Sequence, residues 1–129
     1  VNQAKETAIS IIEGGADVIS PMANDASVGI MEAGEEKGVM AVGCGLGQES
    51  SAPTATKIII VKDVAIAIKS TFDAYAKGEL NPTEVETYGA NKGVVYATEW
   101  SVDVNDEAKT RLQETIDKMA KGEVEISLQ

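Results

Sequence analysis

The sequence predicts an α/β fold built as three layers around a mostly parallel sheet. Helical segments alternate with short apolar strands along the chain, and short turns join them. The strands at 39–42 and 57–61 are apolar almost throughout, which suits a parallel sheet covered on both faces. The periodicity predicts helices at 2–13, 26–37, 62–77 and 105–121, and strands at 16–20, 39–43, 57–61, 93–98 and 123–127.

Turn residues support these boundaries in chain order. The predicted helices are followed by glycines, at positions 14, 38, 78 and 122. Pro21 ends the first strand, and Asp25 is well placed to cap the helix that follows. Asn105 or Asp103 is placed to cap the last helix. Residues 78–92 contain Asn81-Pro82 and are interpreted as a connector, followed by a closing strand–helix–strand at 93–129.

Length and charge limit the classes of protein that fit. The chain has 129 residues and 43% apolar residues, which suits a single α/β lobe and is too apolar for disorder. Its net charge of −10 argues against nucleic acid and against an anionic membrane surface as partners. The longest apolar runs fall far short of the roughly 20 residues that a membrane span needs.

The residue types present argue against an enzyme. The chain has no histidine, which excludes Ser-His-Asp and Cys-His catalysis within it and zinc sites built on imidazole. The single cysteine, Cys44, is interpreted as a small buried thiol. The carboxylates Glu32, Glu35 and Glu36 are interpreted as solvated helix surface. We therefore expect no catalytic residues, no metal and no cofactor.

Polar and glycine residues follow three of the predicted strands. Carboxyl ends of parallel strands are where α/β folds bind ligands. The glycine-rich turn at 43–47 lacks the third glycine of a dinucleotide fingerprint, because Gln48 stands there. From these positions, the expected ligand-binding residues are Asn24, Asp25, Gly45 and Lys62.

Three of these residues also have a purely structural interpretation. Asn24 and Asp25 could serve only as helix caps, and Lys62 could be an exposed, solvated lysine. A lysine at a helix N-terminus opposes the helix dipole, and such a local misfit is typical of functional sites.

The beginning of the chain carries its own expectation. Val1 stands in the middle of a helical pattern, so we expect a processed chain or an excised fragment whose opening strand lies upstream. Such a chain would expose apolar edges, and a homodimer would cover them.

The order of motifs resembles the basic membrane protein family of substrate-binding lipoproteins, which includes PnrA-like nucleoside receptors and Med-type regulators. The likeness rests on EGGADVISPMANDASVGIMEAGEEKGVMAVGCGLGQESSAP, on TKIIIVK, and on the closing YGANKGVVYATEWSVDVNDEAKTRLQETIDKMAKGEVEIS. It covers essentially the whole chain and corresponds to the C-terminal lobe and closing segments of that family. Three positions depart from the family pattern: Ser20 stands where an aromatic residue is common, and Gly45 and Gly47 replace the two aspartates before Gln48.

The resemblance implies a type I periplasmic-binding-protein lobe that binds a small polar, nucleoside-like metabolite for an ABC permease. Gln48 and Lys62 match the family's ligand residues, and the resemblance implies that the loop from Met22 to Asp25 contributes to the same site. It implies an extracytoplasmic, membrane-anchored lipoprotein, with 93–129 packing on an N-terminal lobe. The alternative is the ligand-sensing domain of a cytoplasmic regulator, and what lies upstream of Val1 would discriminate the two.

Overall fold

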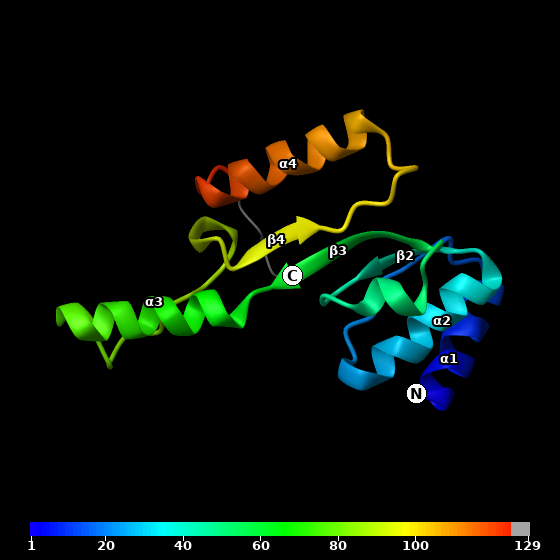
Figure 1. Cartoon of the computed structure of the whole chain (residues 1–129), viewed down its shortest axis with the longest axis horizontal. Helices are drawn as coiled ribbons and strands as arrows, with labels where there is room; N and C mark the ends of the chain where they lie inside the picture. Colours follow the sequence, from blue (N-terminus) through cyan, green and yellow to red (C-terminus); the bar gives the residue numbers. More distant parts are fainter. Residues whose placement is uncertain (125–129) are drawn as a thin grey trace. The chain divides into compact units, whose positions relative to one another are not determined.

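The structure is a computed structural model that describes residues 1–124 (Figure 1). The predicted strand at 123–127 lies mostly outside the described residues. The helices and strands are α1 (Asn2–Glu13), β1 (Val18–Ile19), α2 (Ser27–Lys37), β2 (Met40–Gly43), β3 (Thr56–Lys62), α3 (Val64–Lys77), β4 (Val95–Thr98) and α4 (Asp106–Ala120). The predicted helices and first four predicted strands are therefore confirmed, with their ends shifted.

The strands form one sheet in the order β1-β2-β3-β4. β1 pairs with β2 in parallel, with Val18 opposite Met40, and β2 pairs with β3 in parallel. β4 runs the other way (Figure 1), since the Ser101 amide donates to Lys57 and the Asp63 amide donates to Val94. The predicted α/β class with a mostly parallel sheet is confirmed.

The chain divides into two compact units. The first comprises Val1–Val61 and Ala97–Asn105, and the second comprises Lys62–Tyr96 and the chain from Asp106 onward. The chain therefore passes from one unit to the other three times, at 61/62, 96/97 and 105/106. The prediction of one lobe with a closing segment at 93–129 stays a prediction.

The core of the first unit lies between α2 and the strands. Its buried residues are Ile19, Met31, Ala41, Ala52 and Ala55, and Ile12, Ile30 and Val39 pack against them. Two glycines let α2 approach its neighbours closely. A Cβ on Gly29 would lie 2.4 Å from the Val1 carbonyl oxygen, and one on Gly34 would lie 2.7 Å from Ile19 Cδ1. Small residues thus set the spacing of α2 from α1 and β1.

The second unit is held by polar contacts around α3. Asp63 caps this helix, accepting hydrogen bonds from the Ala65 and Ile66 amides at 3.1 and 3.2 Å. Along the helix, the hydroxyls of Thr71 and Tyr88 lie 3.0 Å apart. The Tyr88 hydroxyl also donates to Glu86 at 2.8 Å. These contacts pin the 86–88 stretch, which belongs to the predicted connector, against α3.

One face of α3 is apolar and exposed. Val64, Ile68, Phe72 and Tyr75 share this face and are 62%, 53%, 68% and 71% exposed. Pairing with a second copy, expected from the sequence, stays a prediction, and this face is where we place it. Light scattering at rising concentration should show association, and Phe72→Glu should weaken it. A compact monomer at high concentration would contradict the prediction.

Two threonines near the start of β3 offer a comparison of a hydroxyl without a hydrogen-bond partner and a hydroxyl with one. The Thr56 side chain is 4% exposed, and its hydroxyl has no hydrogen-bond partner among the described residues. The Thr54 hydroxyl donates to Glu35 at 2.6 Å. Thr56→Val should raise the free energy of unfolding by about 1 kcal/mol, because valine fits a strand without an unsatisfied hydroxyl. Thr54→Val should lower the free energy of unfolding, because it removes a hydrogen bond to Glu35. Urea unfolding of both variants measures the two changes, and changes of the same sign would contradict the difference in hydrogen bonding between the two threonines.

Candidate functional site

The loops that follow β1 and β2 meet at one edge of the sheet. The Ser20 hydroxyl and the Cys44 thiol lie 3.7 Å apart, so the first residues after each strand are in contact. Because β1 and β2 are parallel, both loops leave at their carboxyl ends. The structure thus places the beginnings of the two loops side by side, and the Met22–Asp25 and Gly45–Gln48 segments with five of the predicted ligand residues follow from there.

The loop after β1 is short and turns directly into a helix. Met22 is 74% exposed, and Asn24 has a left-handed φ of 48°, which asparagine adopts more readily than most residues. A short 3₁₀ turn over Asn24–Ala26 runs straight into α2. The Ser27 hydroxyl accepts the Ala23 amide at 3.0 Å and fixes this corner.

The prediction that Asp25 caps the second helix is wrong. The N-cap of α2 is Ala26, which makes no side-chain capping bond in the described structure. The 3₁₀ turn occupies the place where a capping residue would stand, so Asp25 belongs to that turn instead. The helix-capping explanation of Asp25 therefore fails, and its carboxylate is exposed in the 3₁₀ turn.

Gln48 folds back over its own turn. Its Oε1 accepts the Cys44 amide at 2.9 Å, which closes the turn after β2. Its Nε2 lies 3.6 Å from the place where a Cβ on Gly45 would stand. Leu46, which the sequence analysis did not select, is 61% exposed in the same turn. The signal available in the sequence was an apolar residue between two glycines in a turn.

The three glycines of this turn have different reasons to be glycine. A Cβ on Gly43 would lie 2.2 Å from Ile59 Cδ1, and Gly47 has a left-handed φ of 89°. Gly45 has neither constraint: its φ lies outside the left-handed region, and a Cβ there would meet the Gln48 amide at an ordinary contact distance. Gly43 and Gly47 serve the fold, whereas Gly45 leaves open space beside Gln48.

This difference predicts opposite costs for two alanine substitutions. Gly47→Ala should lower the free energy of unfolding by about 1–2 kcal/mol, because alanine is strained in the left-handed region. Gly45→Ala should change it by less than about 0.5 kcal/mol. Chemical denaturation of the two variants beside the parent chain measures both, and equal losses would contradict the distinction.

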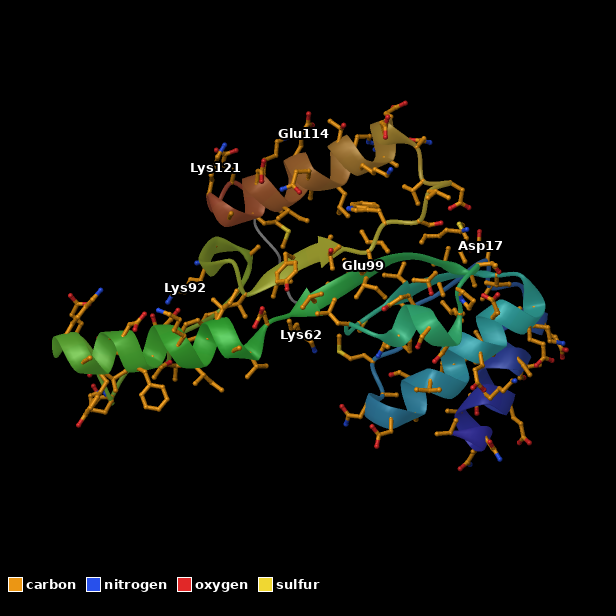
Figure 2. All side chains as sticks on the ribbon, viewed as in Figure 1. Asp17, Lys62, Lys92, Glu99, Glu114 and Lys121 are labelled. Atoms are coloured by element: carbon orange, nitrogen blue, oxygen red, sulfur yellow. The ribbon has the colours of Figure 1, made fainter. Side chains whose placement is uncertain are left out.

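Lys62 is the last residue of β3 and the first residue of the second unit (Figure 2). It is exposed. The helix after it begins at Val64, with Asp63 as the N-cap, so Lys62 does not open the helix as expected. The Asp63 carboxylate stands between Lys62 and the helix and complements the positive helix end. Sequence analysis missed Asp63, although an aspartate before an apolar helix is a known capping signal.

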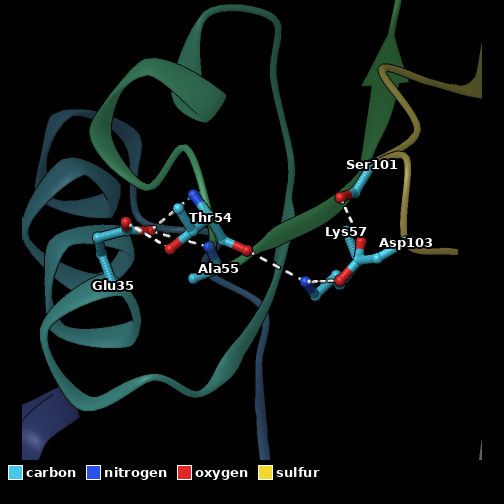
Figure 3. A network of polar contacts seen from close by, with 6 residues as sticks. All are labelled: Glu35, Thr54, Ala55, Lys57, Ser101 and Asp103. Carbon is cyan, nitrogen blue, oxygen red and sulfur yellow. Dashed lines mark hydrogen bonds and ion pairs between the residues drawn. The ribbon is translucent and has the colours of Figure 1, made fainter.

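A polar network anchors the far end of the loop between β2 and β3 (Figure 3). Glu35 Oε2 accepts the Thr54 and Ala55 amides at 3.0 and 2.8 Å, and Oε1 accepts the Thr54 hydroxyl. The Thr54 hydroxyl, followed by the Ala55 amide, holds the pKa of Glu35 below its ordinary value. Glu35 is half-buried and its carboxylate is bonded to the loop, so it is more than solvated helix surface.

The network continues from β3 to the 97–105 segment. Lys57 Nζ donates to the Thr54 carbonyl at 3.1 Å and pairs with Asp103. The Ser101 hydroxyl donates to Asp103 as well. The hydrogen bond from Lys57 is the main cause that lowers the pKa of Asp103, and the Ser101 hydroxyl lowers it further. Asp103, which the sequence analysis considered as a helix cap, is thus tied to β3.

Two features are absent from residues 1–124. No group of three or more histidine, cysteine, aspartate or glutamate side chains in this range could hold a metal ion. No helix in the same range has the length and apolar character to cross a membrane.

Comparisons with solved structures identify the fold. The chain is similar to a transcriptional activator of the comK gene from Bacillus halodurans, with a TM-score of 0.81, 22% identity and 92% of this chain covered. It is also similar to an ABC transporter system solute-binding protein from Conexibacter woesei, with a TM-score of 0.71, 16% identity and 98% coverage. The chain spans 42% of the length of each of these two proteins.

The sequence itself gives the family. No curated protein matches it significantly. The family model described as ABC transporter substrate-binding protein PnrA-like matches residues 1–128. This match extends over nearly the whole chain and agrees with the resemblance that the sequence motifs suggest. The chain belongs to the family of PnrA-like ABC transporter substrate-binding proteins.

Proposed function

We propose that this chain forms part of a solute-binding protein that holds a small polar, nucleoside-like metabolite at the carboxyl edge of its sheet. The observation that carries the proposal is the meeting of two ligand-type loops at Ser20 and Cys44. The family supports a solute-binding role. The nucleoside-like class is our own step, taken from the resemblance of the motifs.

The two loops offer complementary chemistry for such a ligand. The Gln48 and Asn24 amides can each donate and accept hydrogen bonds, and the Asp25 carboxylate can accept from hydroxyls. The exposed Met22 side chain offers a polarizable apolar surface that suits a planar ring. The absence of a side chain at Gly45 lets a ligand approach the Gln48 amide and the backbone closely. Lys62 adds a single ammonium group from the end of β3.

The proposed mechanism is binding without chemistry. A ligand held between two lobes biases an open–closed equilibrium through contacts that form only in the closed state. The closed form then presents the ligand to an ABC permease. We further propose an extracytoplasmic location with a lipid anchor, and packing of the 93–129 segment on a second lobe.

The proposal is tested by calorimetric titration of the full-length product of the gene. The panel is a set of purine and pyrimidine nucleosides, their free bases, ribose, neutral sugars and amino acids. Saturable binding of a nucleoside supports the proposal, and binding of an amino acid or sugar in its place overturns the nucleoside class. Gly45→Leu should abolish binding, because the leucine side chain fills the space beside Gln48. Leu46→Ala leaves that space open and should leave the fold unchanged.

A regulator that senses a ligand is the alternative raised by the sequence. The comK activator is similar at 22% identity, which shows the fold alone. The family description favours transport. Titration on its own does not separate the two roles, so co-purification with a permease is the discriminating measurement.

A further inference from the structure

The loop that carries Gly45 and Gln48 is held at both of its ends. It leaves β2 after Gly43 and enters β3 at Thr56. Near its beginning, the Gln48 side chain is bonded to the Cys44 amide. Near its end, Thr54 and Ala55 are bonded to Glu35 of α2. The turn at 45–48, called the ligand turn below, is therefore held by a hydrogen bond within the loop on one side and by a carboxylate of α2 on the other.

Thr54 is fixed on every polar group it has. Its amide and hydroxyl donate to the two oxygens of Glu35, at 3.0 and 2.6 Å. Its carbonyl accepts from Lys57 at 3.1 Å. Neighbouring backbone contacts add to this, since the Ala55 carbonyl accepts the Ala41 amide at 2.8 Å and the Ala52 carbonyl accepts the Thr56 amide at 3.0 Å. The end of the loop is thus tied to α2, β2 and β3.

The position of Glu35 in its own helix is unfavourable for a carboxylate. Glu35 lies in the last turn of α2, where a carboxylate is disfavoured by the negative end of the helix dipole. Its neighbours Glu32 and Glu36 both face Lys5 of α1, at 3.7 and 3.0 Å. Glu35 instead turns to the loop and accepts three hydrogen bonds. Its placement serves the loop rather than the helix.

We propose that Glu35 is a positioning residue for the ligand turn, acting through Thr54 to hold Gly45 and Gln48 in the geometry that receives the ligand. A turn ordered in advance loses less conformational freedom on binding, so affinity rises without any direct contact to the ligand. This inference rests on the proposed function, since it assigns Glu35 a role at that same site.

Hydrogen exchange measured by mass spectrometry on the full-length protein tests the positioning effect without a ligand. Glu35→Gln keeps the shape but offers one acceptor oxygen in place of two, and Thr54→Val removes the hydroxyl donor. Both should raise amide exchange over residues 44–52 by roughly tenfold. Thr54→Ser keeps the hydroxyl and should restore exchange to the parent rate. Glu36→Gln removes the same charge from the same helix and is the control.

Three exchange results would overturn the inference. One is a rise confined to residues 53–57, which would mean that the anchor does not reach the turn. Another is a uniform rise that includes α1, which would mean general loss of stability. The third is an equal effect of Glu36→Gln, which would mean that charge alone is responsible.

Titration with the nucleoside panel adds a second reading. Where the parent protein binds a nucleoside, Glu35→Gln and Thr54→Val should each weaken that binding by roughly tenfold, mostly through faster dissociation, and Thr54→Ser should keep the parent affinity. Unchanged affinity with raised exchange at 44–52 would overturn the role in binding. Failure of the parent to bind any nucleoside would refute the proposed ligand class, and the exchange measurement would still decide whether Glu35 positions the turn.

Discussion

Replacing Lys62 with alanine should weaken ligand binding by about 1–3 kcal/mol, the scale of a hydrogen bond to a charged group. Lys62 ends β3, and we propose that its ammonium group contacts the ligand. An exposed lysine contributes little packing, so the free energy of unfolding should change by less than about 0.5 kcal/mol. Calorimetric titration of the full-length protein with its nucleoside ligand measures the first effect, and urea unfolding measures the second.

The control for this experiment is Lys121→Ala. Lys121 follows the last helix and is exposed, and its substitution removes the same charge from the chain. It should leave affinity and stability unchanged. Equal affinities for Lys62→Ala and the parent protein would return Lys62 to the role of a solvated surface residue.

Met31→Ala should destabilise the fold by about 2–5 kcal/mol, because it removes a large side chain from a packed core and leaves a cavity. Met31 is fully buried at 0% exposure in α2, within the cluster that includes Ile19 and Ala41. Met22→Ala is the matched control, since the same residue type is 74% exposed there. It should change the free energy of unfolding by less than about 0.5 kcal/mol.

The two methionine variants should also separate stability from binding. Met22→Ala should weaken nucleoside binding, because it removes the apolar surface that we assign to the ring. Thermal unfolding and titration of the same preparations provide both readings. Similar destabilisation by the two variants would contradict the assignment of Met31 to the core and Met22 to the site.

Much of the fold is predictable because its signals are local. The spacing of apolar residues in α1 and α4, and the glycines after them, depend only on neighbours in the chain. The apolar stretch Thr56–Lys62 likewise indicates a strand covered on both faces, and four of its residues are buried. The direction of β4 could not be predicted from local signals, since it depends on the hydrogen bonds that Ser101 and Val94 make with residues of another part of the chain.

The site is only partly predictable for the same reason. Gln48, Asn24 and Gly45 follow strands, and that position is visible in the sequence. In the sequence Glu35 is one of three glutamates in the same helix, and only the fold places Thr54, 19 residues away, against it. Asp25 was interpreted as a cap because the sequence does not reveal that a 3₁₀ turn would precede α2. Contacts between distant residues are what local patterns omit.

The division of the first unit into two stretches of chain has a consequence for its synthesis. Lys57 finds Asp103 only after 46 further residues have been made, and most of these belong to the second unit. The nascent first unit therefore emerges from the ribosome without residues 97–105 and without the ion pair that ties β3 to them. Long-range closures of this kind are slow compared with local helix formation. We expect α1, α2 and the strands between them to form during translation, and the first unit to become complete only when the ribosome has passed Asn105.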